Sequence, residues 1–198
     1  MSEAERSGGS TWPAVLTWRA HDELQMESVR VQCSVNRIKA YGRVVAAATT
    51  AHPAFSASYD LVTDEHGATK RLSLTVTMAE RERQLSIARD EENMWMVQEH
   101  SGQTRRSSFD GALDVDMVFS PFFNALPIRR LGVFPGSGES VTVPVVYVRV
   151  PELAVDVATI SYTATADGIK LSSPVADTTI SVDADGFIID YPGLAARI

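Results

Sequence analysis

Hydrophobic residues occupy every second position over several long stretches of this chain. The pattern is clearest at residues 29–35, 55–61 and 72–78, where apolar and polar or small side chains alternate. Successive side chains of a β-strand point to opposite faces, so each stretch predicts a strand with one apolar and one solvated face. Strands of this kind form antiparallel sheets that are packed on one side only. The sequence therefore predicts a mainly β protein built on an antiparallel sheet.

Short clusters of turn-forming residues separate these stretches. They are rich in Asp, Asn and Gly, which accept turn geometry and positive φ angles. The spacing of about ten residues for one strand and its turn predicts a series of hairpins. Residues 80–83, with the sequence ERER, are predicted to be the solvated end of one hairpin. The turn clusters lie at residues 64–67, 90–93, 136–138, 167–168 and 183–186.

The stretch Val141–Val150 has a different pattern, because apolar residues lie at both odd and even positions. A strand that is apolar on both faces is covered on both sides. Pro144 has no backbone N–H to donate, so at least one edge of this strand is predicted to be unpaired or bulged there.

One segment interrupts the β pattern. Ser120 and Pro121 have the residue types of a helix N-cap and a first helical position, and Gly132 is a typical helix stop. The apolar residues between them predict one short helix near residues 120–131, tightened near Pro127. A sheet of many strands needs closure or a filler for its interior. This apolar helix is the predicted filler.

The length of 198 residues favours one domain, predicted over residues 11–198 after a flexible polar tail at residues 1–10. The net charge of −7 disfavours binding to nucleic acid. No apolar run is long enough for a membrane span. The N-terminus lacks the apolar region of a secretion signal, so a cytoplasmic protein is expected. The single cysteine, Cys33, is predicted to be a buried, inert thiol.

Common enzyme motifs are absent from the sequence. It contains no phosphate-binding loop of the GxxxxGK[ST] type, no HExxH, no GxSxG, no GxGxxG and no CxxC. The four histidines are scattered along the chain and lack the spacing of metal ligands. We therefore predict no catalytic residue, no metal site and no cofactor, and a non-catalytic binding protein is favoured over an enzyme.

Two blocks of the sequence resemble a known family. Residues 111–131 read GALDVDMVFSPFFNALPIRRL, and residues 182–194 read VDADGFIIDYPGL. They are similar to the DVD…SPxxNTLPIRRL and VDxxGxxxDYPGL motifs of a bacterial glycolipid-binding family, once a domain of unknown function. Trp18, Tyr59 and Trp95 also fit the looser N-terminal pattern of that family. The resemblance covers about residues 18–198.

The resemblance implies a spiral β-roll, in which a long, highly curved antiparallel sheet wraps around one helix. That fold is similar to the periplasmic carriers of outer-membrane lipoproteins. The resemblance also implies that the ligand is a glycolipid or another amphiphile. The chain departs from the family pattern at Ala125, where Thr is usual, at Ile160, where Gln is expected, and at Ala195, where an aromatic residue is common.

The charged residues of the first block are candidate ligand contacts. Arg129 and Arg130 carry the donors that bind an anionic or sugar head group. Alternatively, they stabilise the helix C-terminus or pair with an aspartate. Asp114 and Asp116 lie two residues apart and so share one face of a strand. They could act as acid and base or hold a metal, or they could form a buried network with the two arginines that fixes the helix against the sheet.

Four uncharged residues complete the candidates. Asn124 lies on the predicted helix and could orient a head group. Tyr191 could line the mouth of a cavity or pack in a C-terminal turn. Trp18 and Trp95 could contact a lipid chain or fill the core, as alternating aromatic residues commonly do.

These features support three hypotheses about function. In the first, the apolar concave face of the sheet holds an acyl chain, and Arg129 or Asn124 orients the head group at the rim. In the second, the protein is a hydrolase-like enzyme with Asp114, Asp116 and Arg129 in its cavity. In the third, the helix fills the roll completely, and the protein is a structural or interaction module with its function on an outer surface. The first hypothesis is favoured.

Overall fold

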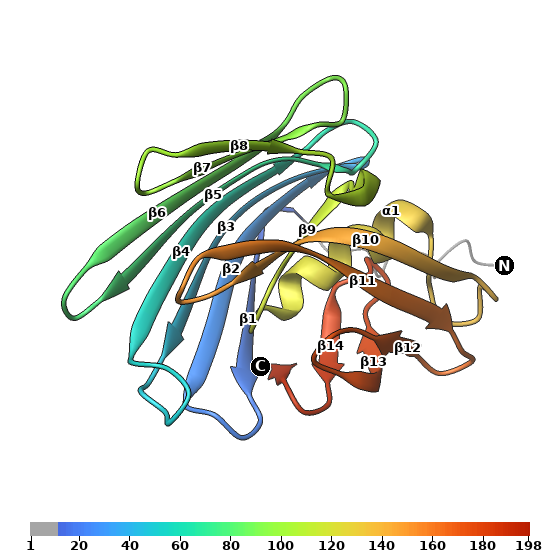
Figure 1. Ribbon diagram of the computed structural model, residues 1–198. Coiled ribbons are helices and arrows are strands. Elements are labelled where there is room, and N and C mark those ends of the chain that lie inside the picture. Colours follow the sequence, from blue (N-terminus) through green and yellow to red (C-terminus); the bar gives the residue numbers. More distant parts are fainter. Residues whose placement is uncertain (1–11) are drawn as a thin grey trace, which may run out of the picture.

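The computed structural model describes residues 12–198, and the tail predicted at residues 1–10 lies outside them. The described chain forms one curved sheet of fifteen strands (Figure 1). Their order across the sheet is β8-β7-β6-β5-β4-β3-β2-β1-β15-β14-β13-β12-β11-β10-β9. In chain order the strands are β1 (Ala14–Ala20), β2 (Gln25–Ser34), β3 (Arg37–Ala46), β4 (Phe55–Thr63), β5 (Thr69–Met78), β6 (Glu82–Arg89), β7 (Trp95–Glu99), β8 (Thr104–Ser107), β9 (Asp114–Met117), β10 (Ser140–Arg149), β11 (Ala154–Ala164), β12 (Ile169–Ser172), β13 (Asp177–Val182), β14 (Ile188–Tyr191) and β15 (Ala195–Arg197).

Almost every pair of neighbouring strands is antiparallel, as predicted from the alternating pattern. The last strand, β15, pairs with β1 and so joins the two ends of the described chain. One pair differs from the prediction, because β9 runs parallel to β10 with Asp114 opposite Val145. The helical segment lies between these two strands in the sequence, and a connection of that length returns the chain in the same direction.

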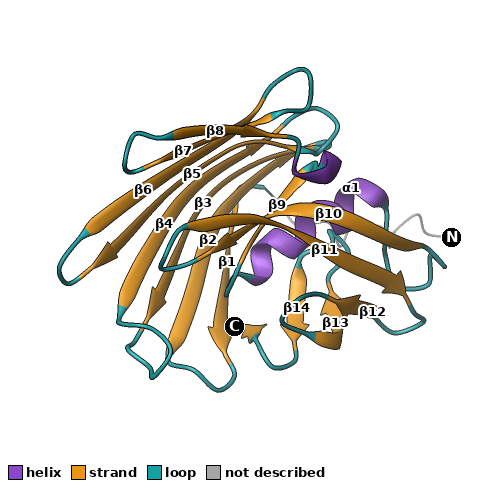
Figure 2. Ribbon diagram, in the orientation of Figure 1, coloured by secondary structure: helices purple, strands orange, loops and turns teal. Residues whose placement is uncertain are grey.

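The sheet curls around the helical segment, which lies inside the curve (Figures 1 and 2). A 3₁₀ helix, η2 (Pro121–Asn124), continues directly into α1 (Ala125–Leu131), and a separate 3₁₀ turn, η1, covers Phe109–Gly111. Gly132 ends α1 in the left-handed conformation, with φ of 69°. The prediction of a mainly β fold, with a highly curved sheet around one short helix, is confirmed.

The start of the helical segment differs from the prediction in two respects. Ser120 makes no side-chain cap bond to the helix, and its hydroxyl donates to the buried carboxylate of Glu27. The tightened 3₁₀ turn covers residues 121–124 rather than the neighbourhood of Pro127.

Side chains of the helical segment fill the concave face of the sheet. Phe122, Phe123 and Leu126 pack into a large cluster with the inward residues of β1–β7 and with one face of β10. Ile128 belongs to a second cluster, formed with the inward residues of β10–β14. The helical segment therefore connects the two halves of the core.

Strand β10 contributes to both clusters, which confirms that it is covered on both faces. Val146 and Val148 pack in the first cluster, and Val145 and Tyr147 pack in the second. Pairing with β9 begins only at Val145, so the β9 side of the strand is free at Pro144, as predicted.

Three hairpin turns share one arrangement of hydrogen bonds. In each, one oxygen of an aspartate accepts the backbone N–H groups of the residues two and four positions further along the chain. The other oxygen accepts from an arginine of a nearby strand. These bonds fix the register of the flanking strands. The pairs are Asp64 with Arg89, Asp90 with Arg106, and Asp183 with Arg197.

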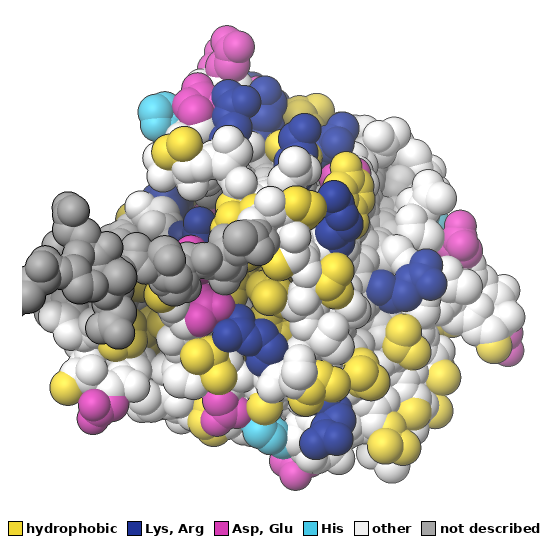
Figure 3. Space-filling view, turned by 180° about the vertical axis from the view of Figure 1, so that it is seen from behind, with side chains coloured by type: hydrophobic (Ala, Val, Ile, Leu, Met, Phe, Trp, Pro, Cys, Tyr) yellow, Lys and Arg dark blue, Asp and Glu magenta, His cyan; other side chains and the backbone are white. Residues whose placement is uncertain are grey.

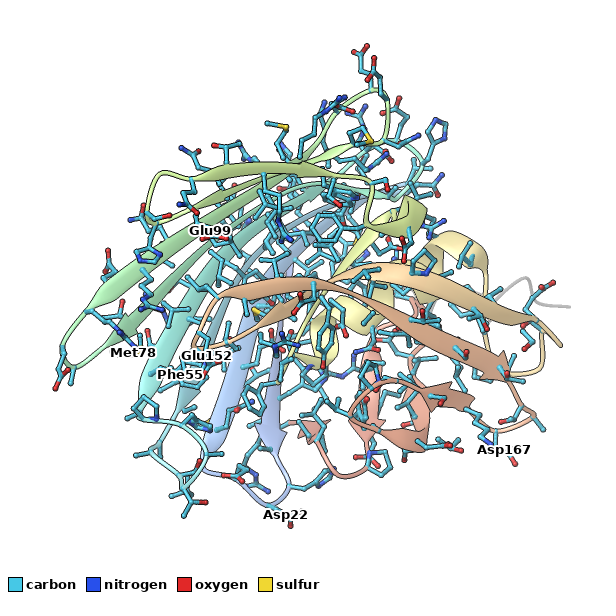
Figure 4. The ribbon with its side chains drawn as sticks, in the orientation of Figure 1. Asp22, Phe55, Met78, Glu99, Glu152 and Asp167 are labelled. Atoms are coloured by element: carbon cyan, nitrogen blue, oxygen red, sulfur yellow. The ribbon has the colours of Figure 1, made fainter. Side chains whose placement is uncertain are left out.

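The turn between β10 and β11, together with the start of β11, closes the roll against its far wall. The backbone oxygen of Glu152 accepts from Arg83 at 3.4 Å, and that of Val155 accepts from Arg105 at 2.8 Å. Figure 4 labels Glu99 and Glu152, which come from opposite walls and line the same small surface pocket.

The surface carries mixed charge on the face shown in Figure 3, where acidic and basic side chains lie among hydrophobic and uncharged ones. Of residues 80–83, predicted to be the solvated end of a hairpin, residues 80–81 lie in the exposed turn before β6, whereas Glu82 and Arg83 are the first residues of β6. Cys33 is half-buried rather than buried, and burial raises the pKa of its thiol to about 11. Within residues 12–198 no helix is long and apolar enough to span a membrane.

Candidate functional site

A pocket of about 570 Å³ opens beside the helical segment. Its walls come from the end of β9 with the start of η2, from β10, and from the β12–β13 and β14–β15 turns. Among the predicted site residues, Asp116, Asn124 and Tyr191 line this pocket. The two recognised sequence blocks therefore meet here, because the second block forms β14 and the turn after it.

Asp116 and Tyr147 are two polar residues of the pocket wall. They are direct neighbours across the parallel β9–β10 pair. The Oδ1 atom of Asp116 and the hydroxyl of Tyr147 are both buried, and neither has a hydrogen-bond partner among residues 12–198. Buried polar groups are nearly always hydrogen-bonded, so two adjacent unpaired ones are a sign of a ligand site.

The buried setting also changes the acidity of these groups. Burial raises the pKa of the Asp116 carboxyl to about 7, although a hydrogen bond from the backbone of Met117 partly opposes this. Burial and the nearby Asp116 charge raise the pKa of Tyr147 to about 12. Near neutral pH, Asp116 can therefore accept or donate a hydrogen bond, while Tyr147 keeps its proton.

Asn124 and Tyr191 lie on other walls of the same pocket. The hydroxyl of Tyr162 donates to the Asn124 side-chain oxygen at 2.9 Å, which fixes the orientation of the amide. Tyr191 is buried, and burial raises the pKa of its hydroxyl to about 12. The pocket wall therefore contains an amide of fixed orientation and a buried phenol.

Three apolar side chains lie at the mouth of the pocket, where the lining also includes the exposed carboxylate of Asp177. Val175 is 69% exposed, and Phe119 and Leu194 lie half-buried beside the opening. The backbone of Phe119 has φ of 73°, an unfavourable value for a residue with a large side chain. Its carbonyl oxygen accepts from Gln25 at 3.0 Å, and its ring packs 5.6 Å from that of His52. The protein therefore holds Phe119 in a strained position at the rim.

A buried hydrogen-bonded cluster lies behind the pocket. Ser120, which lines the pocket, donates to Glu27 Oε1 at 2.6 Å, and Tyr59 donates to the same oxygen at 2.6 Å. Burial raises the pKa of Glu27 to about 7, although the bonds from Ser120 and Tyr59 oppose this. The other oxygen, Oε2, has no partner among residues 12–198. This cluster connects the pocket wall to strands β2 and β4.

The sequence analysis missed Glu27. A signal was present in the alternation along β2. Gln25 and Glu27 lie an even number of residues before Val29 and Val31, so their side chains point to the same, inward face of the strand.

Asp114, although on the same strand face as Asp116, is held elsewhere. It is completely buried and pairs with Arg130 at 2.6 Å. Burial raises the pKa of Asp114, while the Arg130 bonds oppose the rise. The predicted buried network is confirmed for this pair, which attaches α1 to β9.

Arg129 turns away from the main pocket. It bonds to the backbone oxygen of Asp185 and lies over the Phe187 ring, 4.9 Å from its centroid. Together with Arg130 it lines a separate pocket of about 240 Å³. The residues of the hydrolase hypothesis, Asp114, Asp116 and Arg129, therefore do not converge. Among residues 12–198 no group of three His, Cys, Asp or Glu side chains could hold a metal.

Trp18 and Trp95 are core residues rather than pocket residues. Both are fully buried. The indole nitrogen of Trp18 donates to the Ile188 oxygen at 2.9 Å, and that of Trp95 donates to the Ala112 oxygen at 2.8 Å. Their complete burial favours the alternative that the sequence also offered, in which the two indoles fill the core.

Comparison with known proteins agrees with the resemblance. A family model described as "Putative glycolipid-binding" matches residues 15–197. The chain belongs to this glycolipid-binding family. None of the curated proteins compared with the chain is similar to it. The three departures from the family motifs, Ala125, Ile160 and Ala195, are buried core residues outside the lining of the pocket.

The fold is shared with a solved structure. The crystal structure of a DUF1089-family protein from Pseudomonas aeruginosa superimposes with a TM-score of 0.71. The two sequences are 23% identical, and the match covers 99% of this chain and 100% of the other. The curved sheet around a helix is therefore an arrangement that family members have in common.

Proposed function

We propose that this protein is a non-catalytic binding protein for a glycolipid or a similar amphiphile, and that the ligand enters the pocket beside η2. One observation carries the proposal. A single pocket combines unpaired polar atoms in its wall with apolar side chains at its mouth. The unpaired polar atoms can hydrogen-bond to a head group, and the apolar side chains at the mouth can contact an acyl chain. The volume of about 570 Å³ lies within the range of small-molecule sites.

The concave face of the sheet, which the sequence analysis favoured as the trough for the acyl chain, is filled. Residues of the helical segment and of β10 cover it, and inward residues such as Val44, Leu61 and Leu72 have no exposed surface. We therefore propose that the ligand binds at the side of the roll, where Phe119, Val175 and Leu194 would contact the chain.

The filled concave face also bears on the interaction-module hypothesis, which required a closed core. The core is closed, yet the pocket remains open next to it. This observation favours ligand binding over a purely structural role.

The first test asks whether the protein carries or takes up a lipid. Protein purified without detergent is extracted with organic solvent, and the extract is analysed by mass spectrometry. In parallel, added glycolipids are expected to raise the melting temperature of the delipidated protein. The proposal fails if no lipid is extracted and added glycolipids change neither the melting temperature nor the intrinsic fluorescence.

The second test locates the site. Val175→Asp places a charge among the apolar side chains at the mouth and is expected to weaken glycolipid binding about tenfold or more, because the acyl chain would have to desolvate the carboxylate. Val35→Asp is the matched control, since Val35 is 90% exposed in the β2–β3 turn and lies outside the pocket. Equal affinities of the two variants would argue against this pocket.

A further inference from the structure

The register between β9 and β10 places two residues that carry unsatisfied polar atoms opposite each other. Asp116 and Tyr147 are opposite each other in the parallel pair, and both line the pocket. The Asp116 Oδ1 atom and the Tyr147 hydroxyl are buried without partners among residues 12–198. An unpaired buried group is unfavourable, so a ligand that pairs both atoms gains free energy that a plain hydrocarbon does not.

The chemistry of the two atoms is complementary to a diol. The carboxylate oxygen of Asp116 accepts a hydrogen bond from a hydroxyl, and the phenol of Tyr147 donates one to an oxygen. Two neighbouring hydroxyl groups of a sugar ring supply one donor and one acceptor at adjacent positions. A phosphate or sulfate has no donor for Asp116 when it is fully ionised.

The charge of the pocket also favours an uncharged head group. Its lining contains two carboxylates, Asp116 and Asp177, and no Lys or Arg. Arg129 and Arg130, expected from the sequence to bind an anionic head group, line a different pocket. Above pH 7, where the Asp116 carboxyl is ionised, an anionic head group beside it would therefore meet a like charge, and no Lys or Arg lines the pocket to balance it.

We infer that Asp116 and Tyr147 together select an uncharged, polyhydroxylated head group and reject lipids whose head group is phosphate, sulfate or carboxylate. This inference rests on the proposed function, because it assigns the head group of the amphiphile bound in the same pocket. Asp116 accepts from one hydroxyl, Tyr147 donates to the next, and the chain leaves past the apolar side chains at the mouth.

The test compares three lipids that share one chain: octyl glucoside, octyl phosphate and octyltrimethylammonium. Each is titrated into the full-length protein below its critical micelle concentration and at a pH well above 7, where the Asp116 carboxyl is ionised. Binding is measured by calorimetry. Octyl glucoside is expected to bind about tenfold or more tightly than octyl phosphate, the factor that corresponds to one charge-assisted hydrogen bond.

Isosteric variants then assign the preference to the two residues. Asp116→Asn and Tyr147→Phe are each expected to weaken octyl glucoside binding about tenfold. Asp116→Asn is also expected to strengthen octyl phosphate binding, because it removes the repelling charge. Asp156→Asn and Tyr41→Phe make the same changes at exposed positions outside the pocket, and should leave all affinities unchanged.

The outcomes separate this inference from the proposed function. Equal or tighter binding of octyl phosphate, or variants that leave the preference unchanged, would overturn the assignment of the head group while lipid binding stands. Tightest binding of octyltrimethylammonium would identify a site for cations and would equally overturn it. If none of the three lipids binds, the proposed function fails as well.

Discussion

Glu27 shows how a single polar residue can be predictable in position and yet unexpected in role. Because side chains alternate along β2, Glu27 points to the same inward face as Val29, two residues further on. Its importance depends on Tyr59 and Ser120, which approach from distant parts of the chain. Alternation within a strand therefore predicts which residues are buried, whereas their partners depend on tertiary structure.

Glu27 is expected to make the stability of the protein depend on pH. Its pKa is about 7 in the folded state, compared with 4.5 for an ordinary glutamate. The folded protein thus holds this proton more tightly, so the stabilisation is complete below pH 4.5 and is lost as the pH rises through 7. A pKa difference of this size corresponds to roughly 3 kcal/mol. Asp116, with a pKa of about 7, acts in the same direction.

Urea unfolding between pH 4 and 8 tests this dependence. The free energy of unfolding of the unmodified protein should decline across this range. Glu27→Gln should make the decline shallower, because the amide does not ionise, and Glu91→Gln, an exposed change, should not. A decline of the same steepness in Glu27→Gln would show that Glu27 is not responsible.

Gly42 makes room for the tyrosine of this cluster. A Cβ atom at position 42 would lie only 2.1 Å from Cζ of Tyr59. Gly42→Ala is therefore expected to displace the Tyr59 ring and to lower the free energy of unfolding by about 1–3 kcal/mol. The loss should shrink when Tyr59→Ala is present, since the clash is then gone. An equal loss in both backgrounds would assign the effect to the strand backbone instead.

The residues of the pocket were only partly predictable. Asp116, Asn124 and Tyr191 belong to the recognised sequence blocks and do line it. Tyr147 was not among the candidates, because it lies in an apolar run that looks like core. Tyr147 belongs to the proposed site because it lies opposite Asp116 in the β9–β10 pair. The register of that pair cannot be predicted from the local sequence pattern.

At the scale of elements, the hairpins follow from local chemistry. Each of the turns at Asp64, Asp90 and Asp183 is stabilised by bonds between the aspartate and the next few backbone amides. The sequence therefore predicted these turns correctly. The parallel β9–β10 pair was not predicted, because it depends on where α1 lies between the two strands.

The attachment of α1 to β9 is expected to depend on the buried ion pair. Arg130→Ala would leave the carboxylate of Asp114, which has no exposed surface, without its partner. Loss of one member of a buried pair typically costs about 3–5 kcal/mol. The free energy of unfolding, measured with urea, should fall by that amount.

Two comparisons show whether this loss comes from the unpaired charge. Combining Asp114→Leu with Arg130→Met should lower stability much less than Arg130→Ala alone, since no charge is then buried. Arg149→Ala removes an exposed pair, with the Arg149 side chain 50% exposed, and should cost less than about 1 kcal/mol. If Arg149→Ala costs as much as Arg130→Ala, burial of the pair is not the cause.

On the scale of the whole molecule, the sequence indicated the roll but left its interior open to two interpretations. The apolar residues of the segment near 120–131 predicted an internal helix, yet an internal helix is compatible with an open or a filled concave face. The structure is filled because Phe122 and Phe123 on one side and Val146 and Val148 on the other meet in one cluster. Packing of this kind depends on the curvature of the whole sheet.

The two clusters are expected to unfold together, as the prediction of one domain over residues 11–198 requires. Adjacent parts of one short helix belong to both clusters, through Leu126 in the first and Ile128 in the second. A mutation that disrupts one cluster should therefore loosen the helix, and a loosened helix should also weaken packing in the other cluster. Leu126→Ala and Ile128→Ala should each lower the stability of the whole chain by about 2–5 kcal/mol.

Two spectroscopic signals distinguish joint from separate unfolding. The fluorescence of Trp18 and Trp95 reports on the first cluster, and far-ultraviolet circular dichroism reports on all strands. In Ile128→Ala, whose cavity lies in the second cluster, both signals should move to the same lower urea midpoint. A circular dichroism curve with two steps, together with a fluorescence midpoint that does not move, would show that the two halves unfold independently. In that case the helical segment would not couple them, and the chain would comprise two units.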